Sequence, residues 1–590
     1  MSVHRVSRTF GDRGIRPPPK EYVTVGESDL KIIHLRDGKD TGLLQYVRNG
    51  GIAFPHIMVP EALQLRSAAR TSSGMAAGEA PSILRKQQES GASAEAEKGS
   101  EPKSALATAV SQMLWLWNAK QHASEFATRT HMQALLRAES WLPAPLAQVV
   151  FGRVSGTVSA ARTNAMEVEE AEGQRNMLAK TEGPISCIAW HPHRSLVAIA
   201  HRASDAVFLY DLAHDTWCAN VLQNPCMQGI TSMAWQPNSG YTLAVGCTAG
   251  VCLWSMLPLP QSQQQQQQQS DLLEAPGLGS AQFSARMTLM SFPLLPNSYT
   301  FHRSAASVSA LAFSPSGQWL VAGHQTHGHL TVWDVALGSA TPVRRSGSSK
   351  RCATLHVEVS PNGYHVVSTH ANGQLRLWET ERWTSRVWSD FGANVSHFVW
   401  SPDSRSLFFA VAASAKIYAI VLYKSPPSLE AEIAVISTFE AHSTAPLSLS
   451  FGDNDEDDEP IRVGGAIKSL AMDPKGQRLV VGFDDDSTSA DISLLAVYIV
   501  STDALFRAGG GSSALMPLGY IRGPAWGCQR KQDAELPESS KKKRVRMGLP
   551  TPSWFGFAPN FEPGALLTVA WANGKVSFVP MLFNASAFSK

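Results

Sequence analysis

From Ile185 onward, short apolar runs alternate with turns in an order that recurs seven times. Each unit begins with an alternating run that ends on a large apolar residue, followed by one residue, a proline and a turn. The turns are rich in Gly, Asn, Asp and Ser, and proline has a fixed φ and no N–H to donate, so each proline marks the end of a first strand. The seven prolines are Pro192, Pro237, Pro315, Pro361, Pro402, Pro474 and Pro559.

Two further strands are predicted in every unit. A run of β-branched, aromatic or small apolar residues follows each turn, and a third run carries an aromatic residue in register. These aromatic residues are Tyr210, Trp254, Trp333, Trp378, Tyr418, Tyr498 and Phe578. Uninterrupted units lie 45, 46 and 41 residues apart, from 192 to 237, 315 to 361 and 361 to 402. This spacing is typical of WD repeats, which are roughly 40 to 45 residues long.

The pattern predicts an all-β fold, a seven-bladed WD-type β-propeller over residues 185–590, preceded by an N-terminal extension that contains α-helices. Insertions are expected near 258–300, which includes Gln263 to Gln269, near 424–462 and near 501–550. The last unit leaves little chain after Phe578 for an outer strand. We therefore expect a strand near 22–25, Tyr22 to Val25, to close the ring from within residues 1–66.

Between this extension and the first unit, three segments differ in composition. Residues 67–104 are rich in Ala, Ser, Gly and Glu and are predicted to be a disordered linker, and 151–184 a second linker. Residues 105–150 are predicted to be helical, because apolar residues recur there at helical spacing. That helix either packs on the propeller or docks a partner. Its apolar positions are Leu106, Val110, Met113, Leu114 and Trp117.

Composition and motifs argue against an enzyme. The net charge is +2, which gives no reason to expect general nucleic-acid binding. Hydrolase and phosphate-loop motifs are missing, and no metal, cofactor or small-molecule substrate is expected. The His324, His327 and His329 group is read as a surface hairpin, and Cys247 and Cys252 as buried strand cysteines. The longest apolar run, 408–423, is read as two strands, so no membrane-spanning segment is expected.

One basic cluster stands out in the third insertion. Five cations lie within six residues, a pattern typical of a nuclear-import signal or of a patch for an acidic partner, and equally of a solvated loop. The sequence does not decide between these interpretations. The cations are Lys541, Lys542, Lys543, Arg544 and Arg546.

Beyond the generic repeat, the chain resembles the WD-repeat nucleoporins. The resemblance is carried by PPPKEYVTVGE at 17–27, CIAWHPHRSLVAIA at 187–200, RLWETERWTSRVW at 376–388 and above all GALLTVAWANGKVSFVPMLFNASAF at 564–588. It implies a non-catalytic scaffold of the nuclear pore complex at the nuclear envelope, which supports nucleocytoplasmic transport. It also implies other nucleoporins as partners, among them a transmembrane anchor.

An alternative is a WD-repeat substrate receptor or adaptor of a ubiquitin ligase or another regulatory complex. Such receptors resemble one another in a Trp-Asp dipeptide followed by any residue and an arginine. Here Trp333 and Asp334 are followed by Val335 and Ala336, so the sequence favours the pore scaffold.

Overall fold

The computed structural model describes residues 10, 14–20, 22–36, 42–48, 50–59, 184–218, 220–258, 278–279, 283–290, 307–325, 328–343, 352–447, 460–484, 491–501, 515–524 and 549–583. Residues 1–69 and 175–590 form one compact unit, which contains all of these, and residues 70–174 form another. The predicted linker at 67–104 and the helical segment at 105–150 therefore lie outside the described residues.

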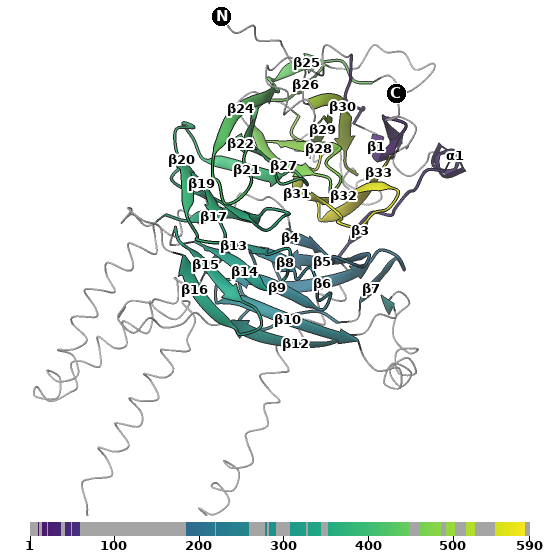
Figure 1. Cartoon of the computed structure of the whole chain (residues 1–590). Coiled ribbons are helices and arrows are strands. Elements are labelled where there is room, and N and C mark those ends of the chain that lie inside the picture. Colours follow the sequence, from purple (N-terminus) through teal and green to yellow (C-terminus); the bar gives the residue numbers. More distant parts are fainter. Residues whose placement is uncertain are drawn as a thin grey trace, which may run out of the picture. The chain divides into compact units, whose positions relative to one another are not determined.

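Within the described residues, seven sheets of four or more strands, built mainly from antiparallel pairs, follow one another around a ring (Figure 1). Their first strands are β4 (Ile185–Trp190), β8 (Ser232–Trp235), β13 (Val308–Phe313), β17 (Thr354–Val359), β21 (Val395–Trp400), β27 (Ile467–Met472) and β31 (Pro552–Phe557). The second strands are β5 (Leu196–His201), β9 (Thr242–Cys247), β14 (Trp319–His324), β18 (His365–His370), β22 (Ser406–Val411), β28 (Arg478–Phe483) and β32 (Gly564–Trp571).

The third strands are β6 (Ala206–Asp211), β10 (Gly250–Pro258), β15 (Leu330–Asp334), β19 (Leu375–Glu379), β23 (Lys416–Leu422), β29 (Leu494–Val500) and β33 (Lys575–Leu582). The outer strands of blades one to six are β7 (Thr216–Cys218), β12 (Phe283–Met290), β16 (Ser339–Val343), β20 (Ser385–Trp388), β24 (Ala431–Thr438) and β30 (Leu515–Arg522). A short strand, β11 (Leu278–Gly279), adds to β7, and β25 (His442–Thr444) pairs with β26 (Ile461–Val463).

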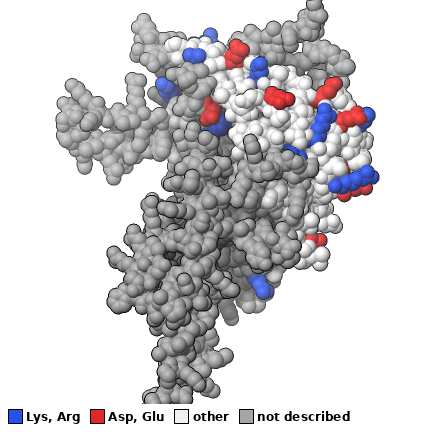
Figure 2. All heavy atoms as spheres, turned by 90° about the vertical axis from the view of Figure 1, so that its left-hand side faces the viewer, with Lys and Arg blue, Asp and Glu red and all other residues white. Residues whose placement is uncertain are grey.

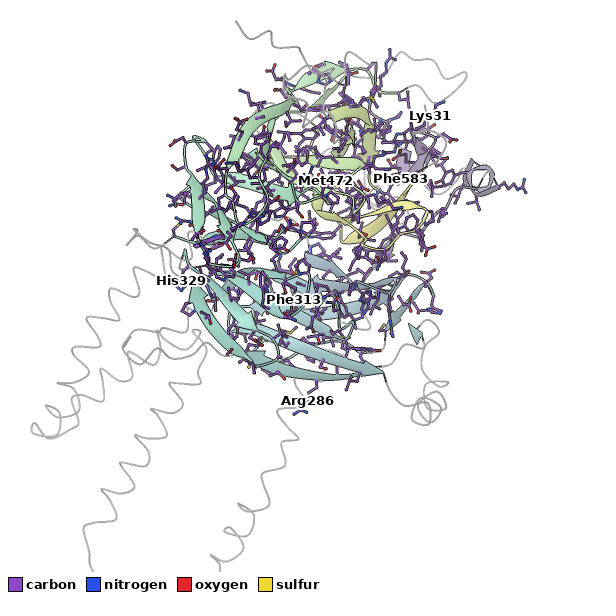
Figure 3. The ribbon with its side chains drawn as sticks, viewed as in Figure 1. Lys31, Arg286, Phe313, His329, Met472 and Phe583 are labelled. Atoms are coloured by element: carbon purple, nitrogen blue, oxygen red, sulfur yellow. The ribbon has the colours of Figure 1, made fainter. Side chains whose placement is uncertain are left out.

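This arrangement confirms the predicted seven-bladed, all-β propeller. Every first strand ends on the large apolar residue that stands two positions before a repeat proline, and every third strand contains the predicted aromatic. Figure 3 shows two of the strand-end residues, Phe313 and Met472, in the inner part of the ring, whereas Arg286 on β12 lies at its outside. The proline therefore acts as a physical stop to the strand, as its missing N–H requires.

The outer strands of blades one to six are the part that the sequence pattern did not locate, whereas a closing strand for blade seven was expected at Tyr22 to Val25. β12, β24 and β30 lie inside the ranges 258–300, 424–462 and 501–550, where insertions were expected. An outer strand pairs on one side only and faces solvent, so it tolerates polar and charged residues and gives a weak hydrophobic signal.

The core consists of seven hydrophobic clusters in the described residues, one at each junction between neighbouring blades. At the junction of the last and first blades, Phe578 from β33 packs with Ile188 and Tyr210 of blade one. Close packing leaves no room for a side chain at Gly323, where a Cβ would lie 2.8 Å from Cγ2 of Thr354 in the next blade. The ring is therefore closed by side-chain packing at every junction.

The seventh blade is completed from the N-terminal end of the chain. β1 (Tyr22–Ser28) runs parallel to β33, with Glu27 opposite Met581, and β2 (Lys31–Arg36) pairs with β1 as the outermost strand. Asp29 and Leu30, at φ 52° and 62°, form the tight turn that matches strand twist. β3 (Ile57–Met58) also pairs with β33, and α1 (Gly42–Arg48) lies between β2 and β3 in the chain.

Candidate functional site

The two sequence-predicted sites lie outside the described residues. These are the basic cluster at 541–546 and the apolar helical positions at 106–117. In the part of the chain that the structure describes, no group of three or more His, Cys, Asp or Glu side chains is arranged to hold a metal ion. Nor does any described helix have the length and apolar character of a membrane span.

Two smaller predictions can be checked. Cys247 and Cys252 are buried on β9 and β10, with their Sγ atoms 3.8 Å apart, which confirms the interpretation as buried strand cysteines. The histidine hairpin differs from the surface hairpin that was expected. His324 is buried, and its Nε2 lies 2.8 Å from the hydroxyl of Thr331, because the last residue of β14 turns its side chain into the sheet rather than toward solvent.

A group of polar side chains, which the repeat pattern did not predict, occurs on the innermost strands. The imidazoles of His356 on β17 and His397 on β21 lie 5.3 Å apart, and Glu358 follows His356 on the same face of its strand. Burial lowers the pKa of His356 to about 4 and that of His397 to about 3, and it raises the pKa of Glu358 to about 8. At neutral pH all three groups are therefore uncharged and offer hydrogen bonds rather than charge.

The turns after the third strands are shaped by acidic residues. In blade three, Oδ1 of Asp334 accepts the N–H of Leu337 at 2.9 Å. In blade four, the buried carboxylate of Glu379 accepts the N–H groups of Glu381 at 2.5 Å and of Arg382 at 3.0 Å. The acidic residue of the Trp-Asp and Trp-Glu dipeptides thus fixes the turn that follows, because it satisfies N–H groups that have no strand partner there.

Several turns at this end of the blades present large apolar side chains to solvent. Leu337 in blade three, Tyr364 in blade four and Tyr423 in blade five are 79%, 56% and 60% exposed. All three lie in turns between first and second or between third and fourth strands. Successive strands of an antiparallel sheet run in opposite directions, so these turns share one face of the ring, which we call the turn face.

Aromatic residues support this part of the turn face. The indole rings of Trp319 in blade three and Trp383 in blade four meet edge to face at 6.0 Å. Trp383 stands at φ 56°, a left-handed conformation that costs energy for a residue other than glycine, in the turn that Glu379 holds. Exposed aromatic and apolar side chains on a rigid support are typical of protein-binding hot spots. Charges of both signs are interspersed over the described side that Figure 2 views.

Comparisons with known proteins identify a WD repeat in the chain and a relative of similar sequence. The family model "WD domain, G-beta repeat" matches residues 295–334, which end on the Trp333 and Asp334 of blade three. Aladin of Arabidopsis thaliana is 24% identical over 402 residues, which cover 68% of this chain and 76% of that protein. The chain is an aladin-like WD-repeat protein. Among solved structures, the β-propeller domain of Myceliophteria thermophila Cps50 (Swd1) matches with a TM-score of 0.41 and 12% identity, covering 67% of this chain and 96% of that domain.

In this aladin-like chain, two buried arginines bind the N-terminal segment to blade six. Arg478 on β28 is completely buried, and its guanidinium donates to both carboxylate oxygens of Glu27, at 2.5 to 3.1 Å. It also lies 4.7 Å from the ring centroid of Phe583, which Figure 3 labels. Nothing in the sequence joins residues 451 positions apart, so this pair was not predicted.

The second arginine, Arg522 on β30, anchors the same segment. Its guanidinium donates to the carbonyl of Pro18 at 3.1 Å and to the carboxylate of Asp491 at 3.2 Å, and its backbone N–H donates to the hydroxyl of Thr24 at 2.9 Å. Farther toward the N-terminus, Phe10 is buried among aromatic rings of blades five and six. The described part of residues 10–36 thus acts as a clasp across blades five, six and seven.

Proposed function

We propose that this chain is a non-catalytic scaffold component of the nuclear pore complex, held at the nuclear envelope by a transmembrane nucleoporin and supporting nucleocytoplasmic transport. The observation that carries the proposal is the likeness to aladin over 68% of the chain, together with the WD-repeat match. As a WD-repeat nucleoporin, it has other nucleoporins as partners, and it uses no cofactor, small-molecule substrate or nucleic acid.

Two structural features support a scaffold. The clasp and the packed blade junctions make a rigid ring, and the turn face offers Leu337, Tyr364 and Tyr423 to a protein partner.

The test is a fluorescent fusion of the full chain, followed by microscopy and affinity purification from interphase cells. The proposal predicts a ring of signal at the nuclear envelope and nucleoporins, one of them membrane-spanning, among the purified proteins. The fluorescent protein alone is the control. A diffuse cytosolic signal without nucleoporins in the purified material overturns the proposal.

A further inference from the structure

The outer strand of blade five is unusually open to solvent. β24 is eight residues long, and its four consecutive residues 432–435 are all exposed. Among the described strands it pairs only with β23. The outer strand of blade six, β30, differs: it is mostly buried, and Ile32 of β2 lies against its Gly519. The strand of blade four, β20, has only four residues and does not match the length of β24 (Figure 1).

The free edge of β24 presents main-chain groups outward at two known positions. On β23, the backbone N–H of Leu422 donates to the carbonyl of Arg405, the residue before β22. Leu422 and every second residue before it therefore form their main-chain hydrogen bonds with β22. The residues between them bond toward β24, where they pair with Glu432 and Ala434. The N–H and C=O groups of Ile433 and Val435 therefore point away from the sheet. A strand with such groups is a template for another strand.

The side chains beside this edge form an apolar wall with a cation at one end. Ala431 belongs to the cluster between blades four and five, and Ile433 and Val435 share its face of the strand. They remain 37% and 54% exposed. Arg386 of β20 is exposed, and its guanidinium lies 5.1 Å from the ring centroid of Trp388. It donates one bond of 3.2 Å to the backbone carbonyl of Leu429, which lies shortly before the start of β24.

We propose that β24 is a docking strand, which takes an extended segment of a partner protein as an added outer strand of blade five. Main-chain bonds to Ile433 and Val435 give affinity, and apolar side chains at alternate positions of the partner pack on the same two residues. A carboxylate of the partner pairs with Arg386, whose five N–H donors are not exhausted by one carbonyl. This inference does not depend on the place of the chain in the nuclear pore.

Charge complementarity favours a partner over a second copy of this chain. If two copies paired through β24, each would need a carboxylate on the face of Ile433 and Val435 to meet Arg386. The only acid of the strand, Glu432, lies on the opposite face and accepts the hydroxyl of Tyr423 at 3.1 Å. The occupant is therefore a segment with its own acidic residue.

The probe is a fluorescein-labelled peptide in which valine and threonine alternate and one end carries a glutamate, titrated with the full-length chain by fluorescence polarisation. Binding is expected to weaken about tenfold in Ile433→Pro, which removes an outward N–H and leaves the ladder to β23 intact. Arg386→Glu is expected to weaken binding similarly, and a peptide with lysine in place of glutamate restores it. The matched control, Leu289→Lys on β12, changes an exposed apolar residue on the outer strand of another blade and leaves binding unchanged.

Three outcomes overturn the inference. One is equal binding by the parent chain and Arg386→Glu, a surface change that keeps the fold. Another is equal binding of a peptide whose central valines are replaced by proline, because such a peptide cannot add to a sheet edge. The third is concentration-dependent dimerisation of the parent chain in sedimentation that Ile433→Pro abolishes, which assigns the edge to a second copy.

Discussion

At the scale of single residues, the buried ion pair of Glu27 and Arg478 is the site where a mutation is expected to reduce stability most. Both side chains are buried, at 1% and 0% exposure, so removal of the carboxylate leaves a buried guanidinium without its counter-charge. Glu27→Ala is expected to lower the free energy of unfolding by about 3 to 5 kcal/mol. Chemical denaturation of the purified full-length chain measures this difference.

The control is an ion pair of similar length on the surface. Lys424 and Glu430 are 2.6 Å apart, but both side chains are more than 60% exposed. Lys424→Ala is expected to change stability by less than about 1 kcal/mol, because solvent and salt screen the pair. Equal losses in the two variants would show that burial does not set the strength of the Glu27 pair.

Glu358 gives a prediction about pH. Its pKa is raised from 4.5 to about 8 by burial, so the folded state keeps the proton while the unfolded state releases it. The carboxyl therefore costs stability as pH rises from 4.5 toward 8, and the full cost is present above 8. Glu358→Gln, which is always neutral, is expected to be more stable than the parent at pH 9 and equal to it at pH 4. Thermal melts across this range measure the difference, and a constant offset contradicts the expectation.

The repeat pattern located the aromatic residues of the third strands, but it did not locate the buried polar residues that contact one another across the ring. Trp333 and Trp378 repeat at fixed distances from a proline, and local spacing is visible in a single chain. Glu27, Arg478 and His356 act through neighbours brought together by the closure of the ring. Such contacts leave no periodic trace in the sequence.

At the scale of elements, the pattern predicted the first three strands of each blade and the closing strand of blade seven, but not the outer strands of blades one to six. First strands alternate and end two residues before a proline, and second strands are buried on both faces and give a continuous apolar signal, so both types are visible in the sequence. The outer strand β24 has four consecutive exposed residues, and its sequence AEIAVIST falls within a range expected to hold an insertion. β24 is an outer strand because it pairs with β23, and its own composition does not predict that position.

The clasp formed by residues 10–36 is the element with the largest expected effect on stability. Deletion of residues 1–36 removes Glu27 from Arg478, Pro18 from Arg522 and the buried ring of Phe10. The melting temperature is expected to fall by roughly 10 °C or more, since the losses amount to several kcal/mol. A scan by differential scanning fluorimetry measures it. Addition of a peptide that spans residues 1–36 is expected to restore part of the loss, and an unchanged melt after deletion contradicts the role of the clasp.

At the scale of the whole ring, each blade depends on both neighbours, since every hydrophobic cluster in the described residues spans a junction. Among the residues that the structure describes, no blade has a complete core of its own. The ring therefore gains rigidity from closure, and its exposed turns are free to vary in sequence and to bind. The residues that stabilise the fold at the blade junctions are therefore distinct from the exposed turn residues that can contact partners. The two roles can be tested independently.

The turn face provides that test. Tyr364 and Tyr423 are 56% and 60% exposed, so Tyr364→Glu combined with Tyr423→Glu should leave the melting temperature within about 2 °C of the parent. If this face binds a partner, the added charge is expected to remove at least one protein from the set that co-purifies with the tagged chain, because buried charge at an interface is costly. The matched control is Glu381→Lys with Arg405→Glu, two charged residues on the same face. Identical purified sets for the parent and the tyrosine variant would place the partner contacts elsewhere on the ring.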